Sequence, residues 1–86
     1  MYRPTTKIKH ELDTLDNHKN YKKAVYNIFK IMTHKSTPNL KIYNDIHYIC
    51  LKSIRKNELN SNPNLFIQAI DDIKNKLSIA KQERVI

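Results

Sequence analysis

The chain contains no glycine among its 86 residues, and this absence restricts the folds that are open to it. Tight two-residue β-hairpins need positive φ angles, which glycine adopts most easily. No segment shows the two-residue alternation that marks a half-buried strand, whereas the 3.6-residue period of an amphipathic helix fits most of the chain. The sequence therefore predicts an all-α fold.

Periodicity and proline positions predict four helices joined by short connections. Apolar side chains recur at three- and four-residue intervals along each of them. Pro38 must follow the end of the second helix, because proline cannot continue a helix. Pro63 fits the first turn of the fourth, where a missing N–H costs nothing. The expected helices lie near residues 5–16, 18–34, 40–57 and 63–82.

These helices are expected to pack as one domain over residues 1–86. Short connections favour antiparallel neighbours, so the sequence predicts a compact bundle of three long helices and one short N-terminal helix. The apolar arc of the third helix covers more than half of its circumference, with Leu40 and Leu51 at the margin. We therefore expect the third helix to be the central one. A core this small also leaves room for a homodimer.

Cysteine usage and hydropathy favour a cytoplasmic location. The single cysteine, Cys50, excludes an internal disulfide and lies in an apolar run that is typical of a core. The N-terminal residues lack the charged-then-apolar pattern of a signal peptide. No apolar run approaches the ~20 residues of a membrane span. We expect a cytoplasmic protein that does not associate with membranes.

The net charge of +8 is concentrated in the middle of the chain. Residues 17–57 contain nine basic residues and one acidic residue, and the segments on either side are each neutral. In the last segment, Asp71 and Asp72 are expected to pair locally with Asn75 and Lys76. Segregation of this kind is typical of a surface that binds polyanions.

Two of the expected helices carry basic residues with an embedded tyrosine on the face opposite their apolar stripe. On the second helix these are Lys19, Lys22, Lys23, Tyr26 and Lys30, and on the third they are Lys41, Tyr48, Lys52, Arg55 and Lys56. Lysines attract phosphates, and tyrosines can stack on bases. We interpret these faces as the contact surface of a small non-enzymatic protein that binds nucleic acid or a nucleoprotein.

The mode of binding follows from the residue types. The chain has few arginines, which leaves little capacity for bidentate readout of base edges. Binding would then be directed mostly at the phosphate backbone and would weaken with salt. The two basic faces form one patch only if the fold points them to the same side.

Other readings of the same lysines stay open. The chain is rich in Ile, Lys and Asn, residues that A/T-rich codons favour, and a lysine-rich helix face can be simply solvated. Alternatively, the protein is an inhibitor, adaptor or immunity-type protein of a phage, plasmid or low-GC bacterium, which docks on an acidic surface of a host protein. Membrane association is not expected, because the apolar faces are committed to a core.

The sequence offers no arrangement that predicts catalysis. His47 and Cys50 are one helical turn apart, but two ligands do not complete a metal site. They are also the only candidate pair for nucleophilic catalysis, and a buried thiol is a poor nucleophile. Phosphate-cradling glycine motifs cannot exist in this chain. We therefore expect no catalytic residue, no metal and no cofactor, and hence no enzyme.

Overall fold

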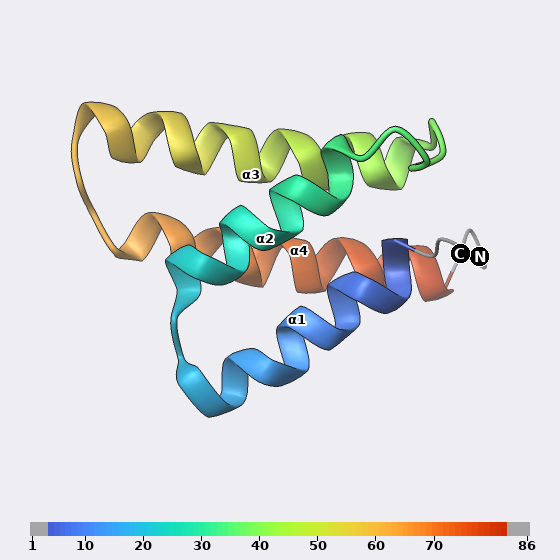
Figure 1. The fold of residues 1–86 in the computed structure, drawn as a ribbon, viewed down its shortest axis with the longest axis horizontal. Coiled ribbons are helices and arrows are strands. Elements are labelled where there is room, and N and C mark those ends of the chain that lie inside the picture. The colour runs from blue at the N-terminus through green and yellow to red at the C-terminus, as the bar shows by residue number, and fades with distance from the viewer. Residues whose placement is uncertain (1–3, 83–86) are drawn as a thin grey trace.

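Four α-helices account for most of the chain (Figure 1). The computed structural model describes residues 4–82, with side chains as far as residue 79. Helix α1 spans Pro4–His18, α2 Tyr21–Thr33, α3 Lys41–Leu59 and α4 Asn64–Gln82. No strand occurs within the described range. The predicted all-α class with four helices is confirmed.

The connection between α1 and α2 lies later in the chain than the sequence predicts. Helix α1 continues past Asp16 to His18, and α2 begins only at Tyr21. The side-chain oxygen of Asn20 accepts a hydrogen bond from the backbone N–H of Lys23 at 3.2 Å, and this cap fixes the start of α2. As a result α2, with 13 residues, is shorter than α1, with 15. The lengths agree roughly with the expected three long helices and one short one, although the shortest helix is α2 and not the N-terminal α1.

Lys19 ends α1 in the left-handed backbone conformation, with a φ of 52°. Its N–H donates to the carbonyl of Leu15 at 2.7 Å, which is the hydrogen bond of a left-handed C-cap. Glycine is the usual residue at this position, because a Cβ costs ~1–2 kcal/mol in this conformation. In a chain without glycine, Lys19 carries that cost.

The central helix is α2, and the expectation that α3 is central is wrong. Helix α2 packs closely against each of the other three helices, whereas the backbone of α3 packs closely against those of α2 and α4. Figure 1 shows α2 crossing α4 diagonally, with α1 and α3 on either side. The wide apolar arc of α3 misleads because two helices, α2 and α4, cover it, and because the apolar residues at the two ends of the helix face solvent. Leu40, just before α3, is 40% exposed, and Leu59, at its end, is 89% exposed.

One apolar core joins the four helices. Its largest fully buried side chains are Ile8, Val25, Ile28, Ile46, Cys50, Ile70 and Ile73. Two polar contacts supplement it: Thr5 Oγ1 and the hydroxyl of Tyr43 lie 2.8 Å apart, and Asn27 Nδ2 donates to Glu11 Oε2 at 3.2 Å. These bonds tie α1 to α3 and to α2. Among the described side chains, no buried polar atom lacks a hydrogen-bond partner.

Candidate functional site

The predicted basic site residues are all exposed on the surface. Lys19 lies in the α1–α2 connection, and the others lie on α2 and α3. They are Lys19, Lys22, Lys23, Lys30, Lys41, Lys52, Arg55 and Lys56. For the residues on α2 and α3, exposure follows from the helical period, because each faces away from the apolar stripe of its own helix. Their arrangement relative to one another depends on how the helices pack.

The two predicted tyrosines differ in exposure. Tyr48 on α3 is 62% exposed. Tyr26 on α2 is half-buried against the core, with its ring centroid 6.3 Å from that of Phe66. The expectation that Tyr26 lies among solvated lysines is therefore corrected: the first turn of α4 brings Phe66 against it. Tyr48 is the tyrosine whose ring is available for stacking.

The basic residues of α3 border a groove between α3 and α4. We call Tyr48, Lys52, Arg55 and Lys56 the α3 basic face. Three of these residues, Tyr48, Lys52 and Lys56, line one side of the groove, which has a volume of about 170 Å³. On the α4 side the groove is lined by Leu65, Gln68, Ala69 and Asp72. We call it the α3–α4 groove.

The α3 basic face points away from α2. His47 of α3 stacks on Phe29 of α2, with ring centroids 5.1 Å apart and an interplanar angle of 21°. Asp45, on the opposite flank of α3, pairs with a lysine of α4. Lys52 follows Asp45 by two helical turns and so shares its side of the helix. Lys19 and Lys22 line a separate depression from the one that Lys52 and Lys56 line, so these two pairs of lysines do not share one groove.

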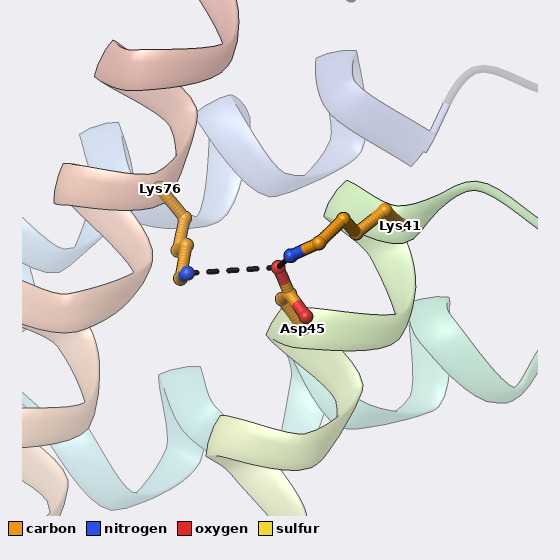
Figure 2. Close-up of polar contacts among 3 residues, drawn as sticks. All are labelled: Lys41, Asp45 and Lys76. Atoms are coloured by element: carbon orange, nitrogen blue, oxygen red, sulfur yellow. Dashed lines mark hydrogen bonds and ion pairs between the residues drawn. The ribbon is translucent and has the colours of Figure 1, made fainter.

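Lys41 forms an ion pair with Asp45 and lies apart from the rest of the predicted site. Figure 2 shows Lys41 and Lys76 approaching one carboxylate oxygen of Asp45, at 3.0 and 3.5 Å. The hydrogen bond from Lys41 is the main reason why the pKa of Asp45 lies below its ordinary value. Lys41 also lies eleven residues before Lys52, which is ~16 Å along a helix. Its charge is paired within α3 and lies away from the groove.

The acidic residues of α4 pair differently from the sequence expectation. Asp72 accepts a hydrogen bond from Nε2 of Gln68 at 3.1 Å. Lys76, expected as a local partner for the acidic pair, instead reaches Asp45 across the α3–α4 contact. The expected pairing with Lys76 is wrong because a local spacing rule cannot anticipate a partner on another helix. Gln68 and Asp72 line the groove and were not predicted, since their role depends on the α3–α4 packing.

A second depression lies where α2 and α4 begin. It has a volume of about 500 Å³, and its lining includes Lys19, Lys22, Pro63, Phe66 and Ile67. Ile67 is 40% exposed. We call this the α2–α4 depression. Its lining combines two lysines with apolar side chains and lacks an acidic residue, so it offers a different chemistry from that of the α3–α4 groove.

His47 and Cys50, the candidate pair for nucleophilic catalysis, are poorly placed for it. Cys50 is buried, and burial raises the pKa of its thiol to about 12. The thiolate that would act as nucleophile is therefore scarce at neutral pH. The ring of His47 is stacked on Phe29. Within residues 4–82, no group of three or more His, Cys, Asp or Glu side chains is placed to hold a metal ion.

Comparisons with protein-family models, with curated proteins and with solved structures gave no match. No helix in the described part of the chain has both the length and the apolar character needed to cross a membrane. The functional interpretation therefore rests on the side chains described above. Of these, the α3 basic face has the most specific combination of charge and shape.

Proposed function

We propose that this protein is a non-enzymatic module that binds nucleic acid through the α3 basic face. The observation that carries the proposal is the exposed ring of Tyr48 beside the lysines of the α3–α4 groove. Cations supply phosphate affinity, and an exposed aromatic ring supplies a stacking surface. The two kinds of side chain lie together along the α3 side of the groove.

The spacing along α3 suits a polymer of phosphates. Tyr48, Lys52 and Lys56 recur every four residues, so they rise ~6 Å per step along one side of the helix. The three positions span ~12 Å. At the ~3.4 Å per nucleotide of a stacked strand, that length matches about three or four nucleotides, and a more extended strand places fewer along it. Arg55, exposed on the same helix, adds a further cation beside this row.

The proposal is tested by fluorescence anisotropy with labelled oligonucleotides at about 50 and 200 mM salt. Binding that weakens steeply with salt is expected, because counterions are released from each contacted phosphate. Lys52→Glu/Arg55→Glu should abolish binding without unfolding the protein, since both side chains are exposed. Wild-type protein that fails to bind at the lower salt would refute the proposal.

A second candidate function is supported by the α2–α4 depression. Its apolar lining residues, among them the half-exposed Ile67, and its two lysines fit an acidic protein surface that presents an apolar side chain. This matches the alternative of an inhibitor, adaptor or immunity-type protein that docks on a host target. Leu59, 89% exposed at the end of α3, adds apolar surface at the same end of the bundle.

A nuclease-treated pull-down distinguishes this candidate from the first. A stoichiometric protein partner that survives nuclease and is lost with Ile67→Glu would support docking at the depression. The variant Lys52→Glu/Arg55→Glu should retain such a partner, because those residues do not line the depression. A partner that is released by nuclease, or lost with both variants alike, would argue against it.

A further inference from the structure

We infer that the α3–α4 groove receives an unstacked base of a single-stranded nucleic acid, with Tyr48 against the base and Lys52 and Lys56 on the flanking phosphates. This inference rests on the proposed function and narrows it from nucleic acid in general to single strands. It follows from the unequal chemistry of the two walls of the groove.

The α3 wall carries the positive charge and the α4 wall does not. Lys52 and Lys56 stand on α3, whereas α4 contributes Gln68 and Asp72. The carboxylate of Asp72 is held by the amide of Gln68 at 3.1 Å. A phosphate placed deep in the groove would meet this carboxylate and be repelled. Phosphates are therefore expected at the lysine rim and not inside the groove.

A base fits the interior where a phosphate does not. Its faces are apolar and can lie against Leu65 and the half-buried Ile49, which both line the groove. Its exocyclic amine can donate to a carboxylate, as cytosine does to acidic side chains in base recognition. The exposed ring of Tyr48, at the same groove, offers a stacking partner.

Only an unpaired strand can supply such a base. In a duplex the base faces are stacked on their neighbours and the pairing edges are occupied, so neither Tyr48 nor Asp72 could reach them without extrusion of the base. Recognition by aromatic stacking is accordingly found with single strands, loops and ends. A duplex could still contact the lysines through its phosphates, but it would gain nothing from Tyr48.

The test compares a mixed-sequence single-stranded oligodeoxynucleotide of about 12 nucleotides with the matching duplex, by anisotropy at constant salt. Tyr48→Leu, which keeps apolar bulk but loses the ring, should weaken single-strand binding by about 5- to 150-fold and leave duplex binding unchanged. Tyr48→Phe keeps the ring and should stay within about twofold of wild type. Equal effects of Tyr48→Leu on both probes, or no effect on either, would overturn the inference.

A charge-matched pair of variants locates the base. Asp72→Asn and the exposed neighbour Asp71→Asn raise the net charge equally. With a base in the groove, Asp72→Asn should bind the single strand at least about threefold more weakly than Asp71→Asn, because the acceptor of the hydrogen bond from the base loses its charge. With a phosphate in the groove the order would be reversed, and the inference would fail.

Failure of the inference can be told apart from failure of the proposed function. If Lys52→Gln/Lys56→Gln weakens binding to both probes while Tyr48→Leu changes neither, α3 binds phosphates and the base contact alone is refuted. If the lysine variant leaves both affinities unchanged, the proposed function itself is refuted. Unchanged thermal unfolding of each variant is the folding control, since these side chains are exposed.

Discussion

Replacing Lys19 with glycine should stabilise the fold. The backbone at this residue has a φ of 52°, where a Cβ costs ~1–2 kcal/mol. Glycine removes this cost but gives the unfolded chain more freedom, which offsets ~0.5–1 kcal/mol of the gain. The difference predicts that Lys19→Gly raises the free energy of unfolding by about 0.5–1 kcal/mol.

Urea unfolding followed by circular dichroism measures this change, provided that the m-value stays constant. The matched control is Lys19→Ala, which removes the same charge but keeps the Cβ and should unfold close to wild type. The thermal midpoint of the glycine variant should rise by about 2–8 °C. A glycine variant less stable than the alanine variant would refute the claim that the left-handed backbone at Lys19 limits stability here.

Three further experiments test the packing and the charges. Ile28 is fully buried in α2, so Ile28→Ala should lower the free energy of unfolding by about 2–5 kcal/mol, and a loss under about 1 kcal/mol would contradict the packing of the central helix. The pKa of Asp45 is lowered chiefly by the hydrogen bond from Lys41, so its charge stabilises the fold above the unfolded-state pKa, and this contribution disappears as the pH falls through the folded-state pKa. In pH-dependent urea unfolding, Asp45→Asn should cost up to about 1 kcal/mol at neutral pH and progressively less as the pH falls through the lowered pKa of Asp45, and a cost that does not change with pH would argue against the ion pair with Lys41 and Lys76. Because burial raises the pKa of Cys50 to about 12, its thiol should react with an aromatic disulfide reagent only as fast as the protein opens, and immediate reaction of the native protein would show that it is accessible.

The helices could be predicted from local signals, but one boundary could not. Apolar periodicity and the positions of Pro38 and Pro63 are properties of short windows, and they placed all four helices. Between α1 and α2, both Asn17 and Asn20 are residues that cap helices. Asn20 is the actual cap because its side chain reaches the N–H of Lys23. The residue type alone does not show which of the two asparagines makes this bond.

The site was only partly predictable, because a helical wheel describes one helix at a time. It placed the lysines in solvent, since exposure depends on the side opposite the apolar stripe. It treated Tyr26 and Tyr48 alike, although Phe66 packs against Tyr26 and leaves Tyr48 exposed. The groove wall formed by Asp72 likewise appears only when α4 lies beside α3. A helical wheel omits the contacts between helices that are distant in sequence.

The nucleic-acid site on α3 is tested most directly by two variants that lose the same charge. The measurement is how steeply salt weakens the binding of each variant to a single strand. Lys52→Gln/Lys56→Gln removes two charges from the groove, and Lys9→Gln/Lys74→Gln removes two from exposed positions on α1 and α4. Each phosphate contact contributes ~0.7 to the slope of log affinity against log salt. The groove variant should therefore lose up to about 1.4 of this slope, and the control should lose little. Equal slopes for the two variants would show that net charge alone governs binding and would contradict a nucleic-acid site on α3.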